Sequence, residues 1–211
     1  MNIKPFPYSL YLVISEADCM GKNFLEVAEQ AILGGVDIIQ LREKKDSTEA
    51  FLQKAMHLIE VTNKYGIPLI INDNITVTEK VNAAGIHVGN SDATPQDLRQ
   101  RPLIGNKMIG YSIEHMDQLY NEQTTVADYL GISPVFKTKT KTDTVIEWGL
   151  DGITQIRQLT KKPLVAIGNI HLENARAVIS AGADCLAVVS AICSAADPQK
   201  AAYELKNEIV K

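Results

Sequence analysis

Eight short apolar runs, each followed by a segment of helical character, constrain the fold of this chain more than any other feature. The runs have the length of single strands, and their apolar residues are continuous rather than alternating. Continuous apolar runs are typical of strands that are buried on both faces of a parallel sheet. The expected strands are residues 8–14, 37–42, 67–73, 85–89, 108–112, 129–133, 164–168 and 185–190.

The segments between these runs carry signals of helix formation. Apolar residues recur at helical spacing from Phe24 to Leu33, and Gly34 closes that segment. Thr94-Pro95 followed by Asp97 combines a capping side chain, a proline in the first turn and an acid at the third position. The expected helices are residues 24–33, 47–65, 76–83, a segment starting at 94–95, and then 114–121, 151–159, 172–180 and 197–210.

Alternating strands and helices predict an α/β protein, and eight such units predict a (β/α)₈ TIM barrel. A weak internal repeat supports this fold, because small residues join three helix ends to the next strand. The repeats are Gly34-Gly-Val-Asp-Ile-Ile, Ala83-Ala-Gly-Ile-His-Val and Ala181-Gly-Ala-Asp-Cys-Leu. A doubly wound open sheet is the alternative, but it usually contains fewer strands. The 211 residues suit a single domain over residues 1–211.

The composition argues against two classes of partner. A formal net charge of −4 disfavours binding to nucleic acid or to an anionic membrane, and no apolar run approaches the length of a membrane span. Cys19, Cys185 and Cys193 are odd in number and lack metal-binding spacing, which indicates a reducing, cytoplasmic environment. Small-molecule substrates are therefore the expected partners, and self-association into a homo-oligomer is left open.

Polar residues gather at the carboxyl ends of the expected strands. In a parallel barrel these ends form one face, and that face carries the active site. Each residue by itself is also explained as a turn or a cap; Asp92, for example, comes just before a helix. Seven of the eight strands end in this way, which points to a shared site. The residues at these ends are Gln40, Arg42, Glu43, Lys44, Asn72, Asp73, Asp92, Ser112, Asn169 and Ser190, with the apolar Leu41 and Val189 among them, together with segment 137–142.

In segment 137–142, lysine alternates with threonine from Lys137 to Thr142, directly after the sixth expected strand. Six consecutive ammonium and hydroxyl side chains cannot form core, and a strand with one all-lysine face would repel itself unless an anion lay against it. An isolated lysine run is usually a solvated loop. Its place at the carboxyl end of a barrel strand favours an anion-binding loop instead.

The polar residues sort by their chemistry. Arg42, Lys44 and Lys141 are cations suited to a multiply charged anion, whereas a divalent ion between Asp73 and Asp92 would explain both carboxylates. Two carboxylates plus substrate phosphate oxygens are a usual environment of magnesium. Backbone amides after the last two strands are suited to a phosphate group. The sequence therefore suggests two anionic groups, one bound through magnesium and one bound by amides.

The sequence shows no set of residues typical of covalent catalysis. No Ser–His–Asp or Cys–His arrangement stands out; His87 and His115 are candidate bases, but the place of His87 in the middle of a strand favours a structural role. Chemistry driven by a leaving group and by charge stabilisation fits these residues better.

Six motifs resemble the thiamine-phosphate synthase family, in register from about Tyr11 to the C-terminus. They are Gln40-Leu-Arg-Glu-Lys44, Ile71-Asn-Asp73, His87-Val-Gly-Asn-Ser-Asp92, Gly131-Ile-Ser-Pro-Val-Phe-Lys-Thr-Lys-Thr-Lys141, Ala166-Ile-Gly-Asn-Ile170 and Ala181-Gly-Ala-Asp-Cys-Leu-Ala-Val-Val-Ser190. The resemblance implies a TIM-barrel transferase. It would join 4-amino-5-hydroxymethyl-2-methylpyrimidine diphosphate to a thiazole phosphate, carboxylated or not, and release pyrophosphate by a dissociative, magnesium-assisted mechanism.

The resemblance also implies a role for each matching residue. Asp73 and Asp92 would bind Mg²⁺, and Arg42, Ser112 and Lys141 would be catalytic. The pyrimidine diphosphate would be held by Gln40, Leu41, Arg42, Glu43, Lys44, Asn72, Ser112 and Lys141. The thiazole phosphate would be held by Thr138, Lys139, Thr140, Asn169, Val189 and Ser190.

The chain departs from the family pattern at several positions of the expected site. Asn169 and Ser133 each replace a glycine of the family pattern. Asn74 replaces an arginine, Asn90 replaces a glutamine, and Ile113-Glu114 replaces a Thr-His pair.

Three rival functions are compatible with parts of this pattern. A thiazole tautomerase on the same barrel would need a catalytic histidine after the fifth strand, where this chain has His115. A non-catalytic binder of thiamine precursors would bind the same compounds without turnover. Another phosphate-binding barrel enzyme, such as an isomerase of aromatic amino-acid synthesis, would not need both Asp73 and Asp92. These two aspartates and Lys141 favour the synthase.

Overall fold

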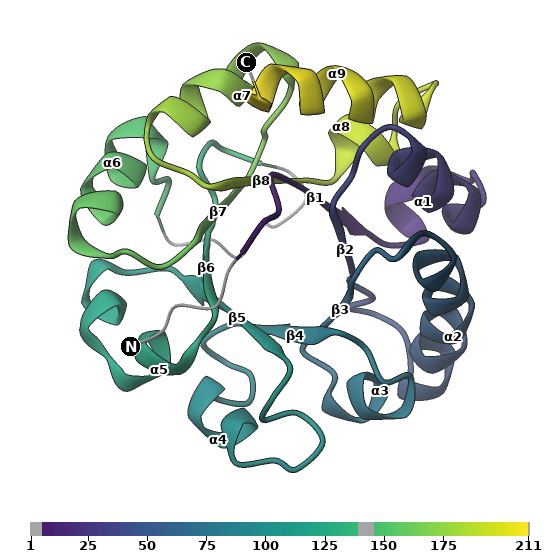
Figure 1. Cartoon of the computed structure of the whole chain (residues 1–211), viewed down its shortest axis with the longest axis horizontal. Coiled ribbons are helices and arrows are strands. Elements are labelled where there is room, and N and C mark those ends of the chain that lie inside the picture. Colours follow the sequence, from purple (N-terminus) through teal and green to yellow (C-terminus); the bar gives the residue numbers. More distant parts are fainter. Residues whose placement is uncertain (1–5, 139–145, 211) are drawn as a thin grey trace.

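The eight apolar runs form the eight parallel strands of a closed barrel. The computed structural model describes residues 6–138 and 146–210, and its strands pair in chain order until β8 closes on β1. Figure 1 shows this ring, with the helices outside it. The predicted (β/α)₈ fold is confirmed, and the open-sheet alternative is wrong. The strands are β1 Leu10–Ile14, β2 Ile38–Leu41, β3 Leu69–Asn72, β4 Gly85–Val88, β5 Met108–Ile113, β6 Tyr129–Ile132, β7 Leu164–Ile167 and β8 Cys185–Val188.

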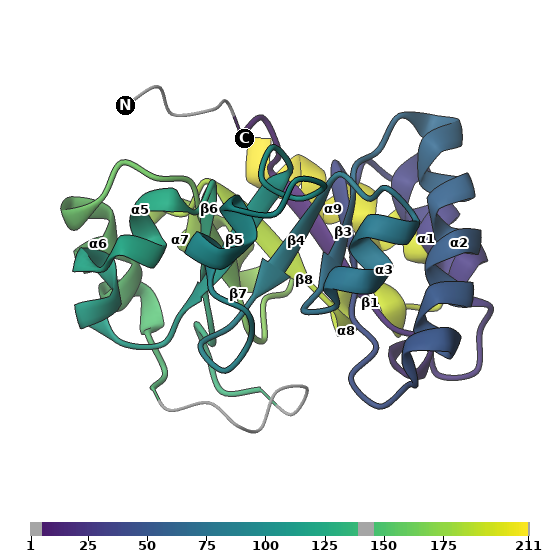
Figure 2. The same ribbon diagram turned by 90° about the horizontal axis from the view of Figure 1, so that it is seen from below.

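The helices cover the outside of the barrel, as the side view in Figure 2 shows. Side-chain caps open several of them; Asn23, for example, accepts a hydrogen bond from the amide of Leu25 at the start of α1. The α-helices are α1 Phe24–Leu33, α2 Thr48–Tyr65, α3 Ile75–Lys80, α4 Pro95–Arg99, α5 Glu122–Val126, α6 Gly149–Leu159, α7 Leu172–Ser180, α8 Ser190–Cys193 and α9 Pro198–Val210, and the 3₁₀ helices are η1 Ala17–Cys19 and η2 Met116–Tyr120.

Two helix predictions were wrong. The expected single helix 114–121 is instead the 3₁₀ helix η2 followed by α5, because Asn121 adopts extended backbone angles and its side chain caps α5 by accepting from the amide of Thr124 at 2.9 Å. The four-residue helix α8 was not predicted; it begins at Ser190, where the strand 185–190 was expected to continue.

The strands separate two apolar regions, because successive side chains of a strand point to opposite faces. On β1, Leu12 and Ile14 point outward into the large core between barrel and helices. Tyr11 and Val13 point inward, where they pack with Ile38 and other residues of a smaller core that fills the barrel. Burial of each leucine or isoleucine in these regions contributes roughly 1.5–3 kcal/mol to stability.

Aspartates at the amino ends of β2, β6 and β8 tie these strands to their neighbours; Asp37 and Asp184 belong to the internal repeat, and Asp128 lies outside it. Each accepts a backbone amide from the preceding strand and pairs with a cation on a helix. Asp37 Oδ2 accepts from Leu10 at 2.9 Å, Asp128 Oδ2 from Ile109 at 2.8 Å and Asp184 Oδ2 from Leu164 at 2.8 Å. Their cationic partners are Lys206, Arg99 and Arg157, respectively.

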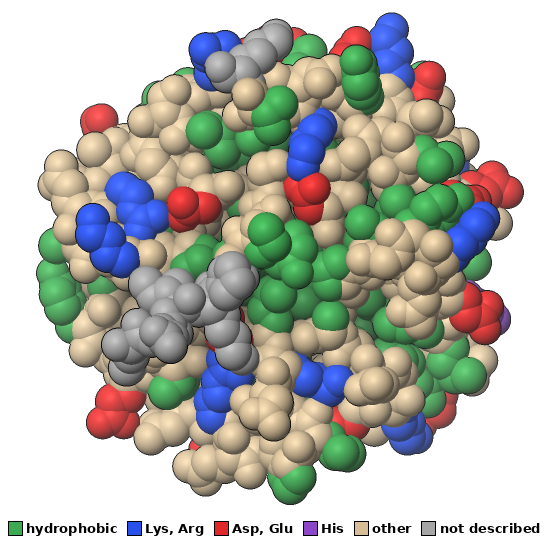
Figure 3. Space-filling model, viewed as in Figure 1, with side chains coloured by type: hydrophobic (Ala, Val, Ile, Leu, Met, Phe, Trp, Pro, Cys, Tyr) green, Lys and Arg blue, Asp and Glu red, His purple; other side chains and the backbone are tan. Residues whose placement is uncertain are grey.

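The surface in Figure 3 has a hydrophobic centre, and basic and acidic side chains are interspersed around it rather than gathered into one patch. No helix in the described part of the chain is both long and apolar enough to cross a membrane.

Candidate active site

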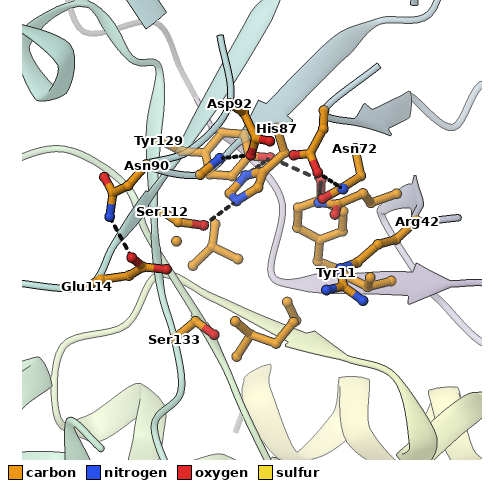
Figure 4. Close-up of a pocket in the computed structure, with 18 of the residues that line it drawn as sticks. Tyr11, Arg42, Asn72, His87, Asn90, Asp92, Ser112, Glu114, Tyr129 and Ser133 are labelled. Carbon is orange, nitrogen blue, oxygen red and sulfur yellow. Dashed lines mark hydrogen bonds between the residues drawn. The ribbon is translucent and has the colours of Figure 1, made fainter. Parts of the chain in front are cut away.

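A cavity of about 290 Å³ lies at the carboxyl ends of the strands, where barrels carry their sites. Figure 4 shows its lining, with Arg42 and Asn72 on one side and Asn90 and Glu114 on the other. The strands supply these residues in turn, since their inward positions line the same central space. Of the residues predicted from the sequence, the cavity lining contains Gln40, Arg42, Lys44, Asn72, Asp73, Asp92 and Ser112.

Strand alternation explains why two predicted residues at the end of β2 and just after it point elsewhere. Gln40, Arg42 and Lys44 face the cavity. Leu41 lies in the outer core, fully buried. The carboxylate of Glu43 accepts the Nζ of Lys54 at 3.2 Å and the amide of Glu16 at 2.9 Å. Glu43 therefore binds neighbouring protein groups on the outer side of the strand rather than the cavity.

A chain of hydrogen bonds crosses the floor of the cavity. Gln40 Nε2 donates to the hydroxyl of Tyr11 at 3.0 Å, and that hydroxyl lies 3.0 Å from the hydroxyl of Tyr129. Nδ1 of His87 lies 3.1 Å from Tyr129 Oη, and Nε2 of His87 lies 3.0 Å from Oγ of Ser112. Five side chains from five strands thus form one continuous network.

The direction of this network follows from its first donor. The amide nitrogen of Gln40 can only donate, so Tyr11 has its own proton to give to Tyr129, and Tyr129 in turn donates to His87 Nδ1. A neutral imidazole that accepts at Nδ1 carries its proton on Nε2, which donates to Ser112. The Ser112 hydroxyl is then directed to donate to a ligand. Burial raises the pKa of both Tyr11 and Tyr129, so both phenols stay protonated.

Two glycines make room for this network. A Cβ at Gly110 would overlap the ring of Tyr129 and Nδ1 of His87. A Cβ at Gly131 would lie 2.9 Å from Cε1 of His87, closer than side chains normally approach. The barrel wall therefore needs glycine at both positions to hold a histidine and a tyrosine inside.

Asp73 and Asp92 face each other at one side of the cavity. Asn72 Nδ2 donates to Asp73 Oδ2 at 2.6 Å, and Lys44 forms an ion pair with the same oxygen. Asp92 Oδ2 accepts the amide of Gly89 at 2.8 Å. Burial raises the pKa of Asp73 to about 6, Lys44 opposes that rise, and the neighbouring Asp92 carboxylate adds to it.

This pair of carboxylates fits a divalent cation. Two carboxylates at hydrogen-bonding separation repel each other when both are ionised. Lys44 pairs with Asp73 and so compensates the charge of only one of them. A cation between hard oxygen ligands would relieve that repulsion, and two carboxylates with substrate phosphate oxygens suit magnesium. Within residues 6–138 and 146–210, no group of three or more histidine, cysteine or acidic side chains is arranged to hold a metal by itself. A cation here would therefore need ligand oxygens from a substrate or water.

A second cavity of about 420 Å³ adjoins the first and reaches the ends of β7 and β8. Thr138, Asn169, Val189 and Ser190 line it, as predicted from the sequence, together with Lys137. The first amides of α8, at its edge, have no partner within the helix and can donate hydrogen bonds to an anion. Three further predicted residues, Lys139, Thr140 and Lys141, lie outside the described residues.

Glycine and asparagine shape the entrance to the second cavity. Gly168 has φ +120°, and a Cβ there would lie 2.7 Å from Cβ of Pro134. Asn169 has φ +49°, a left-handed conformation that asparagine tolerates better than most residues. Its carbonyl accepts Nδ2 of Asn174 at 3.0 Å, which fixes the loop.

The two cavities share a wall. Its members are Val13, Arg42, Ser133, Ile167 and Ala187, which line both spaces. Ser133, a departure from the family glycine, is therefore at the junction. Another departure, Asn74, caps α3 by accepting the amide of Val77 at 2.9 Å. Two molecules bound in these cavities would meet at this mostly apolar wall.

Several residues of the site escaped the sequence analysis. Tyr11 and Tyr129 line the cavity, as does His87, for which a structural role was favoured. Glu114, noted in the sequence only as a departure from the family pattern, lines it as well. Strand alternation gives the only sequence signal for His87, since every second residue of β4 faces inward. His115, the other candidate base, has an exposed side chain and is not part of the lining of either cavity.

Comparisons with known proteins show the family and the fold. The family model for thiamine monophosphate synthase matches residues 10–192. The thiamine-phosphate synthase of Albidiferax ferrireducens is 46% identical over 200 residues, which cover 95% of this chain and 91% of that protein. The thiamine-phosphate synthase of Chloroflexus aurantiacus is 42% identical, covering 94% and 91%. A solved structure of thiamine phosphate pyrophosphorylase from Pyrococcus furiosus superposes with a TM-score of 0.86 at 31% identity, covering 97% of this chain and 96% of that one.

Proposed function

The chain belongs to the thiamine monophosphate synthase family, whose activity is a step of thiamine biosynthesis, and from this premise we propose how its two cavities divide the substrates. The first cavity binds 4-amino-5-hydroxymethyl-2-methylpyrimidine diphosphate. The second binds the phosphate of 4-methyl-5-(2-phosphoethyl)thiazole or its carboxylated form. The products are thiamine phosphate and pyrophosphate.

The diphosphate binds between the cations and carboxylates of the first cavity. Arg42 and Lys44 supply positive charge from the strand β2 side, and Lys141 is proposed to add a third cation. Asp73 and Asp92 would hold Mg²⁺, which would supply positive charge to offset that of the diphosphate. The support for this assignment is the facing pair of carboxylates beside Lys44.

The pyrimidine ring lies over the hydrogen-bonded floor of the first cavity. Ser112 presents a hydroxyl donor, and Gln40 and Asn72, on the neighbouring strands β2 and β3, present amides. These groups suit a flat ring with nitrogen acceptors and an amino group. Val165 and Ala187 supply apolar surface for the face of the ring.

The thiazole phosphate occupies the second cavity. Amides of Val189 and Ser190 and the Asn169 loop bind its phosphate, with Thr138 from the other side and Lys139 and Thr140 proposed to join it. The thiazole ring then extends toward Ser133 and Ile167, where the two cavities meet.

The reaction is a substitution at the pyrimidine methylene carbon. The bond from that carbon to the diphosphate oxygen breaks, and its electron pair leaves with pyrophosphate. The electron-rich aminopyrimidine stabilises the methylene cation until the lone pair of the thiazole nitrogen forms the new C–N bond. No proton is transferred and no enzyme nucleophile is needed, so Arg42, Lys44 and Lys141 contribute mainly by stabilising the departing anion.

The observation that carries this proposal is the shared wall between a cation-and-carboxylate cavity and an amide-lined cavity. The test is to incubate the purified protein with both substrates and magnesium, and to detect thiamine phosphate by oxidation to its fluorescent product. Product that disappears with chelator supports the proposal. Stabilisation by both substrates without product would instead indicate a binder of thiamine precursors.

A further inference from the structure

Two positions at which the chain departs from the family pattern lie in direct contact. Asn90 Nδ2 donates to Oε2 of Glu114 at 2.6 Å, across the gap between the loop after β4 and the end of β5. Both residues line the first cavity, and Figure 4 shows the Glu114 carboxylate beside Ser112.

Buried neighbours fix the orientation of this pair. Oδ1 of Asn90 accepts from the hydroxyl of Tyr111 at 2.6 Å and from Nε2 of Gln118 at 2.6 Å. The amide oxygen is thereby occupied, so Nδ2 must face Glu114. Oε1 of Gln118 accepts the backbone amide of Glu114 at 2.7 Å, and Gln118 is 9% exposed. Glu114 is therefore held at both its backbone and its carboxylate.

The position of Glu114 determines which part of a bound substrate it can contact. Figure 4 places it across the cavity from Arg42. A carboxylate repels the diphosphate, which the cations on the Arg42 side attract, so the diphosphate and Glu114 belong to opposite ends of the bound molecule. An ionised carboxylate can only accept hydrogen bonds, so the group next to it must be a donor.

We propose that Glu114 is a substrate-recognition residue of the first cavity, accepting a hydrogen bond from the amino group on the pyrimidine ring. This inference rests on the proposed function, in which the aminopyrimidine is the substrate that carries N–H groups, whereas a thiazole ring has none. Asn90 is a positioning residue that acts through Glu114. Together they set the ring's orientation and discriminate against rings that lack the amino group.

The test compares two ligands in the unaltered protein and in three variants. The ligands are the aminopyrimidine diphosphate and an analogue with hydrogen in place of the amino group, each titrated calorimetrically with magnesium and without thiazole phosphate. Glu114→Gln should weaken the amino ligand on the order of 10-fold and leave the analogue's affinity unchanged. Asn90→Ala should give a smaller loss with the same selectivity. Glu122→Gln, on the exposed start of α5, is the matched control and should change neither affinity.

The outcomes separate this inference from the proposed function. Equal losses for both ligands in Glu114→Gln, or no loss for either, would overturn the assignment of Glu114 while thiamine phosphate formation by the unaltered protein continues. If the unaltered protein forms no thiamine phosphate from the two substrates, the proposed function itself fails.

Discussion

Nε2 of His87 lies 3.0 Å from Oγ of Ser112, so a residue in the middle of β4 sets the hydrogen-bonding role of a residue at the end of β5. The other imidazole nitrogen is occupied by Tyr129. Because Tyr129 is itself fixed by Tyr11 and Gln40, the tautomer of His87 is determined by the floor of the cavity. The hydroxyl of Ser112 is consequently oriented to donate a hydrogen bond before any ligand binds.

A double-mutant cycle tests this relationship. Ser112→Ala and His87→Phe should each lower kcat/KM by about 10- to 100-fold, because each removes the prepared donor. The double variant should be little worse than either single variant, since both changes remove the same interaction. Urea unfolding of each protein supplies the control for stability. Fully additive losses in kcat/KM would show that His87 acts independently of Ser112.

Much of the fold was predictable because the strands are continuous apolar runs with small residues before them. All eight strands are present, and their order follows from the chain. The failure at 114–121 has a local cause, because Asn121 ends one short helix and caps another. The spacing of apolar residues along the sequence does not reveal such a break between two short helices.

The candidate site was predictable only in part. Residues after the strand ends, such as Arg42 and Asp92, come together because those ends share one face. Whether a side chain points into the cavity or into the outer core depends on the barrel register. The sequence alone therefore did not show that Gln40 faces the cavity whereas Leu41 faces the outer core. The contact between Asn90 and Glu114 joins the loop after β4 to the end of β5, and neither segment by itself predicts it.

Gly110→Ala tests the space that the buried network requires. The added methyl would overlap Tyr129 and His87, so we expect the free energy of unfolding to fall by about 3 kcal/mol or more. Gly66→Ala is the matched control, because Gly66 has φ +68° and no atom lies within 4 Å of its Cβ position. Backbone strain alone should cost that variant about 1 kcal/mol. Equal losses of unfolding free energy in the two variants would contradict this prediction and would mean that the barrel wall shifts to accommodate the added methyl group.

The Asp37–Lys206 ion pair predicts a pH-dependent contribution to stability. Burial alone would raise the pKa of Asp37, but hydrogen bonds from Lys206, Leu10 and Ser9 hold it below its ordinary value of 3.8. A carboxyl group with a depressed folded-state pKa stabilises the fold above pH 3.8, and this stabilisation is lost as the pH falls through the depressed value.

Asp37→Asn should therefore lower the free energy of unfolding by about 1–3 kcal/mol at pH 7, and the difference from the unaltered protein should shrink toward pH 3. Urea unfolding across this range measures both. Glu29→Gln, which breaks an exposed pair with Lys64, should have a smaller effect. A difference for Asp37→Asn that does not vary with pH would contradict the role of its charge.

Asp92→Asn should separate stability from activity. Removing one of two facing carboxylates relieves repulsion, and the asparagine oxygen can still accept the amide of Gly89, so the ligand-free protein should be as stable as before or slightly more so. Turnover should fall by at least 100-fold, and stabilisation by magnesium plus diphosphate should disappear. Asp97→Asn on α4 is the control. Near-normal turnover in Asp92→Asn would remove this residue from the proposed metal site.

Asn169→Gly restores the residue that the family pattern has at this position. The backbone there has φ +49°, which glycine adopts without strain, and the bond to Asn174 uses the carbonyl of residue 169 rather than its side chain. The variant should therefore fold normally, and its turnover should equal or exceed that of the unaltered protein, because less side chain lies beside the phosphate. Steady-state kinetics with varied thiazole phosphate measure both kcat and KM. A KM raised 10-fold or more would mean that the Asn169 amide contacts the phosphate, and that this chain has added a ligand to the second cavity.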